Sequence, residues 1–292
     1  MSLGRILTAM VTPMNDNLEV DYQEAGRLAK YLAEHGTDGI VVAGTTGESP
    51  TLSVEEKLGL FRVVKEAVGR EVIVYAGIGS NSTASSVDLA RKAVATGVDG
   101  LMAVVPYYNK PSQEGLYQHF KTIAEATELP LMLYNIPGRT SINLLPETVL
   151  RLSKIPNIVA LKEAVGLMDQ VSELKRILPE DFMVYSGDDS LTLPMLALGC
   201  SGIISVASHV IGDEMKKMVD AWFEGDTNNA LQWHLKLMPV FKGIFITANP
   251  VPVKYLVNTL GLKAGKVRLP LVDATPEEEK FLTELLQNVK DK

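Results

Sequence analysis

Short apolar segments alternate with amphipathic segments along most of the chain. Eight segments are predominantly apolar, as are strands that a parallel sheet buries on both faces. We predict a strand at each of them. They are residues 6–11, 39–42, 72–76, 100–105, 131–134, 158–162, 183–186 and 202–206.

Between these strands, apolar residues recur at the three- and four-residue spacing of amphipathic helices. Asp21 with Glu24, and Ser53 with Glu56, have the spacing of a capping box, which begins a helix. Pro146 suits the first turn of another helix. The pattern predicts helices at 21–35, 53–68, 82–96, 112–127, 146–153, 168–178, 191–198 and 211–223.

One joint between a helix and a strand occurs three times, at 35–40, 96–101 and 198–203, as glycine, two residues, glycine and an apolar strand. A repeated unit indicates a repeated architecture, and alternating buried strands and helices indicate parallel β–α–β units. Eight such units predict an α/β fold, the (β/α)8 TIM barrel. An open doubly wound sheet is the alternative, but it would be unusually long, and no G-x-G-x-x-G fingerprint supports it.

The alternation stops near residue 225. Helical patterns at 227–247, 253–260 and 275–289 follow without strands between them. We therefore expect a barrel catalytic domain over 1–225 and a C-terminal helical region over 226–292. This extension would pack on the barrel or between subunits.

The composition of the 292 residues, 46% hydrophobic and 22% charged, is typical of a globular protein. A net charge of −7 and the lack of a basic stripe argue against a nucleic-acid partner. The single cysteine, Cys200, allows no internal disulfide, which fits a reducing compartment. Because neither a signal-peptide pattern nor an apolar run of membrane-spanning length is found, we expect a cytoplasmic protein without a membrane partner.

Lys162 ends the apolar segment 158–161. An ammonium beside apolar surface must be paired, reach water or lose its proton. One interpretation is a lysine that extends into solvent. The other is a buried nucleophile that forms a Schiff base with a carbonyl, which requires a pKa lowered from about 10.4 by roughly 3 units.

Residues able to do chemistry follow several of the predicted strands. Because active sites of TIM barrels lie at the C-terminal strand ends, these residues should meet at one rim. Their convergence favours the nucleophilic interpretation of Lys162. They are Gly44–Glu48, Tyr107–Asn109, Tyr134–Arg139, Lys162, Ser186–Asp189 and Ile204–Ser205.

Each group also has a structural interpretation. Residues 44–47 could form a tight turn, or their N–H groups could bind a small carboxylate. Tyr107 and Tyr108 could be interface aromatics, and Tyr134 a core tyrosine. Arg139 could be a surface charge.

Metal and phosphate chemistry find little support. Asp188 and Asp189 are adjacent, but Asp189 or Ser190 suits the N-cap of the next helix. The histidines lack ligand spacing, and Cys200 suits a small buried apolar position. The last two rim loops carry no glycine-rich phosphate cradle. We expect no metal and no cofactor.

Three motifs together resemble the pyruvate-dependent class I aldolases related to N-acetylneuraminate lyase. They are Gly44-Thr45-Thr46-Gly47-Glu48, Tyr134-Asn135-Ile136-Pro137-Gly138-Arg139 and the strand that ends in Lys162. The resemblance covers nearly the whole chain. Tyr107–Pro111 and Arg139 resemble the branch that condenses pyruvate with L-aspartate 4-semialdehyde for diaminopimelate and lysine biosynthesis, because sialate lyases differ there.

The resemblance implies a mechanism. Lys162 would form an imine with pyruvate, and the derived enamine would add to the semialdehyde before cyclisation releases the lysine. Tyr134 would be the acid–base group. Thr45 would link Tyr134 to a tyrosine from the neighbouring subunit, here Tyr108.

The resemblance also implies binding residues. Thr46 would hold the pyruvate carboxylate, and Gly187 and the Ile204 carbonyl would line the pyruvate site. Arg139 would hold the carboxylate of the semialdehyde, for which its fork of donors is suited. The family is typically a tetramer of two tight dimers, so we expect a homo-oligomer in which Tyr108 crosses an interface.

One region departs from relatives that lysine inhibits. Those carry histidines shortly after the Gly-Thr-Thr-Gly-Glu motif and a glutamate in the next rim segment. The matching positions here are Val54, Lys57 and Ser85, although Ser49 and Asn81 remain. We predict weak or absent inhibition by lysine.

Two other functions stay open. An aldolase for sialate or a 2-keto-3-deoxy sugar acid would need a pocket for a polyol, and Arg139 is the discriminating residue. A non-catalytic barrel that binds keto acids would be expected to lack the nucleophile or its relay. Lys162, Tyr134, Thr45 and Tyr108 are all present.

Overall fold

In the computed structural model, which describes residues 3–290, eight strands close into one barrel in chain order. Every neighbouring pair is parallel, and the last strand pairs with the first. The TIM barrel expected from the alternating pattern is confirmed. The strands are β1 (Ile6–Ala9), β2 (Gly39–Val42), β3 (Ile73–Gly77), β4 (Gly100–Val104), β5 (Leu131–Asn135), β6 (Ile158–Glu163), β7 (Met183–Ser186) and β8 (Gly202–Ser205).

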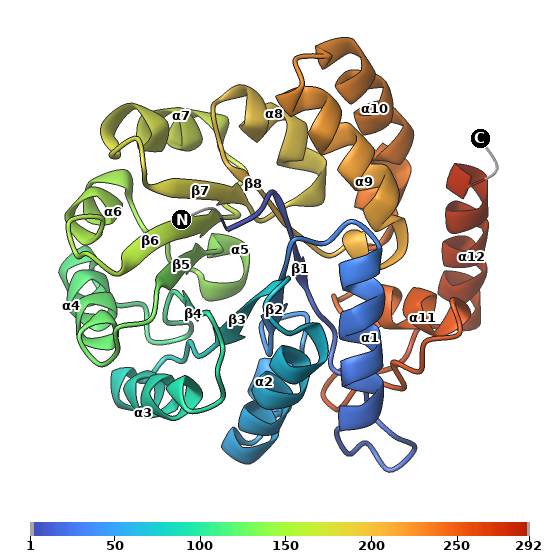
Figure 1. Cartoon of the computed structure of the whole chain (residues 1–292), viewed down its shortest axis with the longest axis horizontal. Coiled ribbons are helices and arrows are strands. Elements are labelled where there is room, and N and C mark those ends of the chain that lie inside the picture. The colour runs from blue at the N-terminus through green and yellow to red at the C-terminus, as the bar shows by residue number, and fades with distance from the viewer. Residues whose placement is uncertain (1–2, 291–292) are drawn as a thin grey trace.

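Helices surround the barrel and continue beyond β8 on one side of it (Figure 1). The helices are α1 (Tyr22–Glu34), α2 (Val54–Val68), α3 (Thr83–Val94), α4 (Gln113–Ala124), α5 (Pro137–Thr140), α6 (Pro146–Leu152), α7 (Met168–Ile177), α8 (Thr192–Ala197), α9 (Ser208–Phe223), α10 (Thr227–Gly243), α11 (Val251–Thr259) and α12 (Pro276–Lys290), with 3₁₀ turns η1 (Ser49–Thr51) and η2 (Asp189–Leu191).

Three elements at the rim were not predicted: η1, α5 and η2. Each is about one turn long, too short to show a helical period in the sequence. Three predicted helix limits were wrong by three or more residues. The helix expected over 227–247 ends at Gly243, and the one expected over 112–127 ends at Ala124. Helix α9 begins at Ser208 rather than 211, with a non-helical break at Ile211.

The capping predictions had different outcomes. Ser53 accepts from the Glu56 N–H at 3.1 Å, and the Glu56 carboxylate accepts from the Ser53 N–H at 2.8 Å, which confirms that capping box. Asp21 accepts from the Glu24 N–H, but its own N–H donates to the Pro13 carbonyl. The reciprocal bond predicted there was wrong, because the preceding loop supplies a nearer acceptor.

The repeated joint has a backbone reason. Gly36, Gly97 and Gly199 have φ values of 79°, 79° and 82°, in the left-handed region that ends helices and that glycine adopts without strain. The chain can therefore turn from each helix directly into the next strand.

The barrel interior is packed with side chains rather than open. Tyr75 and Tyr185 are fully buried in it, and the Tyr185 hydroxyl donates to the Gly4 carbonyl at 2.8 Å. A second, larger apolar cluster fills the layer between strands and helices. The interior of the barrel therefore has no room for a ligand, and the C-terminal strand ends are where TIM barrels carry their active sites.

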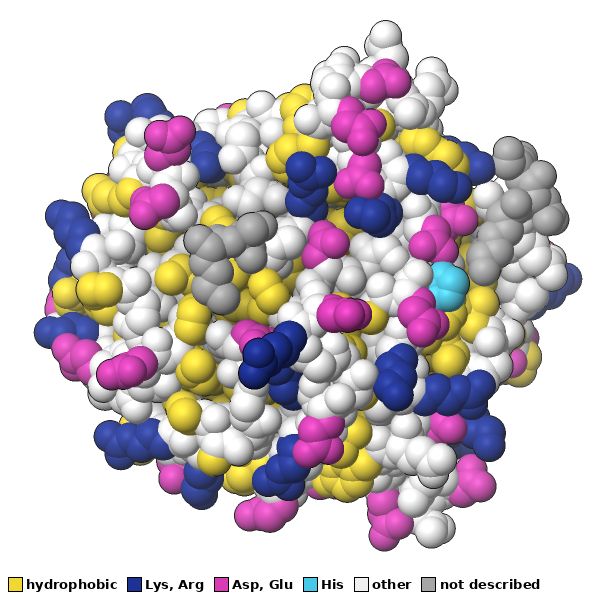
Figure 2. All heavy atoms as spheres, in the orientation of Figure 1, with side chains coloured by type: hydrophobic (Ala, Val, Ile, Leu, Met, Phe, Trp, Pro, Cys, Tyr) yellow, Lys and Arg dark blue, Asp and Glu magenta, His cyan; other side chains and the backbone are white. Residues whose placement is uncertain are grey.

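The helices after β8 pack against one another and against the start of the barrel. Helix α9 contacts α1, α10 and α11, and α12 contacts α10 and α11. In the view of Figure 1, α11 and α12 lie on the same side of the molecule as α1. Within residues 3–290, none of the helices is long and apolar enough to cross a membrane. Figure 2 shows cationic and anionic side chains interspersed over one face, without a broad field of either sign.

Candidate active site

Lys162 is buried at the end of β6. Its residue is 5% exposed, so the solvent-extended interpretation is wrong. In the β5–β6 register Lys162 pairs with Tyr134, and its Nζ lies 4.2 Å from the centroid of the Tyr134 ring. Two residues that are 28 positions apart thus become direct neighbours on the inner face of the barrel.

The environment lowers the pKa of Lys162 to about 8. Burial is the main cause, because a charged ammonium loses its hydration there, and the positive charge of Arg139 adds to the effect. The carboxylate of Asp189 opposes both. A lysine with this pKa holds a useful fraction of free amine near neutral pH, as a Schiff-base nucleophile must.

Tyr134 keeps its proton at physiological pH. Burial raises the pKa of its hydroxyl to about 12, and the opposing effects of Arg139 and of the nearby Thr45 hydroxyl are smaller. A protonated tyrosine next to the lysine can donate a proton, and it can take one only if it passes one on. The Thr45 hydroxyl is in place for such a transfer.

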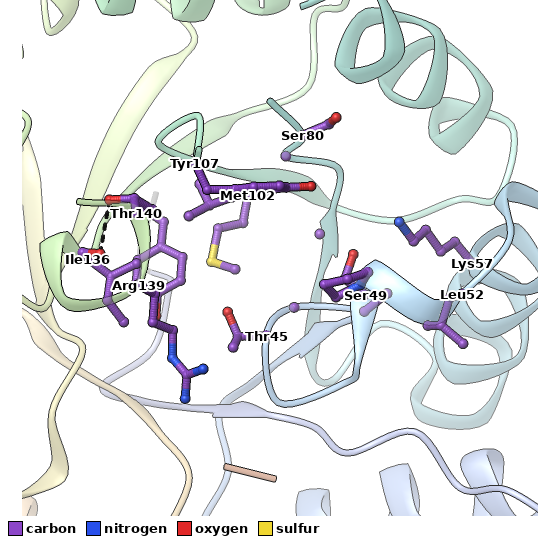
Figure 3. Close-up of a pocket in the computed structure, with 17 residues that line it drawn as sticks. Thr45, Ser49, Leu52, Lys57, Ser80, Met102, Tyr107, Ile136, Arg139 and Thr140 are labelled. Atoms are coloured by element: carbon purple, nitrogen blue, oxygen red, sulfur yellow. Dashed lines mark hydrogen bonds between the residues drawn. The ribbon is translucent and has the colours of Figure 1, made fainter. Parts of the chain in front are cut away.

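A cavity of about 380 Å³ opens beside these residues. Thr45, Tyr107, Tyr134 and Arg139 line it, together with Lys57. Figure 3 shows Thr45 and Arg139 pointing into it, and Lys57 entering from the α2 side. Arg139 is carried by the short helix α5, directly after β5. The cavity is therefore bordered by hydroxyls and by two cations.

Three expected binding residues lie outside this lining. Thr46 is buried, and its Oγ1 accepts from the Asn249 amide at 2.9 Å. Ile204 lies in the barrel-interior cluster that includes Tyr134. Gly187 lies against Lys162, since a Cβ added at Gly187 would be 3.2 Å from the lysine Cε.

Helix α11 and the loops on either side of it anchor the loop after β2. Lys254 of α11 donates to the Glu48 carboxylate at 2.9 Å, and both side chains are almost fully buried. The other Glu48 oxygen accepts from the Arg268 N–H at 2.8 Å. Asn249 holds Thr46 in the same loop. These contacts position Thr45 and Thr46 from a part of the chain about 200 residues away.

Tyr108 is not brought to the site within this chain. It is 89% exposed, it does not line the cavity, and its φ of 74° is rare for a residue with a side chain. A large aromatic side chain held outward in this way is available to a second molecule.

The prediction that Asp189 or Ser190 is the N-cap of the next helix was wrong for both residues. The cap of η2 is Asp188, which accepts from the Ser190 N–H at 2.9 Å. Asp189 instead is buried and accepts from the Ser205 hydroxyl. The backbone N–H groups of residues 206 and 207 also donate to Asp189, both at 3.2 Å.

The burial of Asp189 has an electrostatic consequence. Burial raises the pKa of this carboxyl to about 6, against the effect of its hydrogen bonds. Its charge in turn raises the pKa of Lys162. Asp189 comes shortly after the end of β7, so it could have been predicted to lie near Lys162 and to influence its pKa.

Glu163 is a second residue that sequence reasoning missed. It is buried next to Lys162 in β6 but points to the opposite face, where Asn135 and Gln170 donate to it. The signal was a carboxylate directly after Lys162, at the end of an apolar segment. Cys200 is buried, as predicted, and burial raises the pKa of its thiol to about 12. Over the described residues, no group of three His, Cys, Asp or Glu could hold a metal.

Comparisons with known proteins are consistent with one another. The model of the dihydrodipicolinate synthetase family matches residues 2–289. The 4-hydroxy-tetrahydrodipicolinate synthase of Desulforamulus reducens is 59% identical over 290 residues, which are 99% of this chain and 98% of that protein. The enzyme of that name from Moorella thermoacetica is 60% identical over 287 residues, 98% of each.

Solved structures agree over the same length. A dihydrodipicolinate synthase from Bacillus anthracis superposes with a TM-score of 0.96 at 50% identity, covering 98% of both chains. The enzyme from Cyanidioschyzon merolae, solved with lysine bound, gives a TM-score of 0.97 at 47% identity, covering 99% of this chain and 98% of that one.

Proposed function

The chain belongs to the dihydrodipicolinate synthetase family, and from that premise we infer that it condenses pyruvate with L-aspartate 4-semialdehyde. It is an enzyme of lysine and diaminopimelate biosynthesis, with the activity of a 4-hydroxy-tetrahydrodipicolinate synthase. The observation that carries the mechanism is the buried Lys162, with a pKa of about 8 and its Nζ 4.2 Å from the Tyr134 ring centroid.

The first half of the proposed reaction joins Lys162 to pyruvate. The neutral amine adds to the ketone carbon, and the resulting carbinolamine loses water to give an imine. Loss of a methyl proton then gives an enamine, whose methylene carbon is a nucleophile. Desolvation of Lys162 supports this step, since it supplies the free amine without another base.

The second half forms the new carbon–carbon bond. The enamine carbon adds to the aldehyde carbon of the semialdehyde, which regenerates the imine. The amino nitrogen of the semialdehyde then attacks the imine carbon, closes the ring and releases Lys162 as a free amine. Because lysine is the covalent group throughout, this sequence uses no cofactor.

Proton transfers in both halves are assigned to Tyr134. A hydroxyl with a pKa of about 12 is a poor base by itself, so each proton that it accepts must be passed on at once. The position of Thr45 and Tyr134 in the lining of the same cavity supports that route. We assign the last member of the relay to Tyr108 of a neighbouring subunit, because Tyr108 in its own chain is almost fully exposed.

Substrate carboxylates are assigned to two places. Thr46 binds the pyruvate carboxylate, with Gly187 and the Ile204 carbonyl lining that site. The contact between Gly187 and Lys162 supports this assignment. Arg139 binds the carboxylate of the semialdehyde, supported by its position at the cavity and by the bidentate geometry of guanidinium groups.

The same reasoning makes the active enzyme a homo-oligomer. A tyrosine supplied in trans requires a closed, two-fold interface in which each subunit completes the other's site. We propose a tight dimer of this kind, with two dimers forming a tetramer.

The test is pyruvate consumption by the purified protein with L-aspartate 4-semialdehyde and, separately, with N-acetylmannosamine, using Lys162→Ala as the control. Turnover with the semialdehyde alone, lost in the variant, is the expected result. Turnover with the amino sugar would move the chain to the lyase branch and overturn the assignment of Arg139. A lack of turnover with both would contradict the proposed condensation.

A further inference from the structure

A second pair of residues lies directly behind Lys162 and Tyr134. In the β5–β6 register, the pair that follows Tyr134 and Lys162 is Asn135 and Glu163. Successive side chains of a strand point to opposite faces, so this second pair faces the helix layer while the first faces the barrel interior. Both Asn135 and Glu163 are buried, at 0% and 2% exposure.

The two side chains bridge the strand ends. The Asn135 amide Nδ2 donates to both oxygens of the Glu163 carboxylate, at 3.0 and 3.1 Å. The carboxylate also accepts from the Val165 N–H at 2.8 Å and from the Gln170 amide at 3.2 Å. Glu163 therefore ties the end of β6 to β5, to its own following loop and to α7.

Asn135 is held as firmly as its partner. Its Oδ1 accepts from the Leu144 N–H at 3.0 Å, and its Nδ2 also donates to the Asn143 side chain at 2.7 Å. In the main chain, the Ala164 N–H donates to the Asn135 carbonyl, and the Gly187 N–H donates to the Glu163 carbonyl. The pair thus stands between β5, which carries Tyr134, and the Gly187 segment after β7.

This arrangement is costly for a purely structural contact. Glu163 has no ion-pair partner among residues 3–290, and a buried carboxylate without a cation is less favourable than an apolar pair of similar volume. Burial raises its pKa to about 7, although its hydrogen bonds, those from Asn135 above all, oppose the rise. In return, the polar pair fixes the relative position of the two strands. Hydrogen bonds are directional, whereas apolar contacts would let the strands slide past one another.

We propose that Asn135 and Glu163 are positioning residues that hold the ends of β5 and β6 in register and so fix Tyr134 against Lys162. The inference rests on the proposed roles of Lys162 and Tyr134. A displacement of about 1 Å between reacting groups can lower a rate by about 100-fold, so a small relaxation of these strand ends would be visible in catalysis.

The test exchanges donor and acceptor. In the wild type, one carboxylate oxygen of Glu163 accepts hydrogen bonds from Asn135 and Gln170. In Glu163→Gln, an amide NH₂, which is a donor, replaces that oxygen. In Asn135→Asp, a second carboxylate faces Glu163. The double variant Asn135→Asp/Glu163→Gln restores one donor opposite one acceptor, while Asn143 and Gln170 can turn their amides to match. Glu173→Gln, on the exposed side of α7 and bonded to Arg176, is the matched control.

For each variant we would measure kcat, KM for pyruvate, the melting temperature and the amount of imine trapped by borohydride with pyruvate. We expect each single variant to lose about 10- to 100-fold in kcat, with KM for pyruvate changed by less than about threefold. The double variant should recover about tenfold of that loss, because the two sites are coupled. The control should match the wild type.

An unchanged kcat in Glu163→Gln would overturn the inference. So would a double variant that has the same melting temperature as the single variants but does not recover their loss in kcat. Should Glu163→Gln fail to fold, Gln170→Met removes one donor to Glu163 and keeps the volume. It should lower kcat in the same direction, by about two- to fivefold, and an unchanged kcat there would equally contradict the inference. Absence of a trapped imine in the wild type would overturn the proposed function itself and the inference with it.

Discussion

The Nζ of Lys162 lies 4.2 Å from the centroid of the Tyr134 ring, and the register of β5 and β6 pairs the two residues directly. Both residues are buried, and the Thr45 hydroxyl near Tyr134 acts to lower the pKa of the tyrosine. The lysine that burial leaves partly neutral therefore lies directly beside the tyrosine to which its proton transfers are assigned.

The first prediction concerns pH. The free amine of Lys162 is the nucleophile, so the rate of imine formation should rise as pH increases and level off above its pKa of about 8. At pH 7 about a tenth of the lysine would be neutral, far more than for an ordinary lysine. The measurement is inactivation by borohydride with pyruvate as a function of pH. A rate that still rises tenfold per pH unit above pH 9 would contradict the lowered pKa.

The second prediction concerns Asp189. Its carboxylate raises the pKa of Lys162, so Asp189→Asn should lower that pKa and shift the inflection of imine formation to lower pH. At pH 6.5, imine formation per folded site should be about threefold faster than in the wild type. Asp181→Asn, at an exposed position before β7, is the control. An inflection moved to higher pH would show that hydrogen bonding rather than charge dominates.

The third prediction tests whether Tyr108 acts in trans. Tyr108→Ala and Lys162→Ala should each be nearly inactive alone. After unfolding and refolding together in equal amounts, mixed dimers would each contain one intact site, so about a quarter of wild-type activity should return. Mixing two preparations of the same variant is the control. If the mixture regains no activity, Tyr108 serves its own chain or has no role.

The fourth prediction concerns the buried ion pair between Lys254 and Glu48. Lys254→Met leaves the Glu48 carboxylate buried and without its cation, so the free energy of unfolding should fall by about 3–5 kcal/mol. Lys266→Met, whose lysine is 75% exposed in its contact with Asp273, should change it by less than about 1 kcal/mol. Urea unfolding measures both. Equal effects would mean that burial of the pair contributes little.

The fifth prediction is that submillimolar lysine leaves activity unchanged. Lys57 lines the cavity, and burial lowers the pKa of its amine. A basic residue at this position offers a cationic effector such as lysine no attractive partner. Ser85, at the start of α3, is exposed and uncharged. A Lys57→His/Ser85→Glu variant should gain inhibition, since it removes a repulsive cation and adds an attractive anion. Inhibition of the unchanged protein by submillimolar lysine would refute the prediction.

Much of the fold followed from local pattern. Buried parallel strands are predominantly apolar, so β1 to β8 could be located without knowledge of their partners. Ser53 with Glu56 marked the start of α2 by spacing alone. One-turn elements such as α5 were missed because a single turn shows no period, and α5 is the element that carries Arg139.

The sequence by itself determined which side chains end strands, because the apolar pattern of each β–α unit is local. Since parallel strands of a barrel end at one rim, it also determined which of these side chains could meet there. The tertiary structure alone decided their chemical state. The pKa of Lys162 depends on burial and on Asp189, which is 27 residues away, and the loop that holds Thr45 depends on Lys254, more than 200 residues away. Desolvation and charge act through space, so no spacing in the chain could have predicted them.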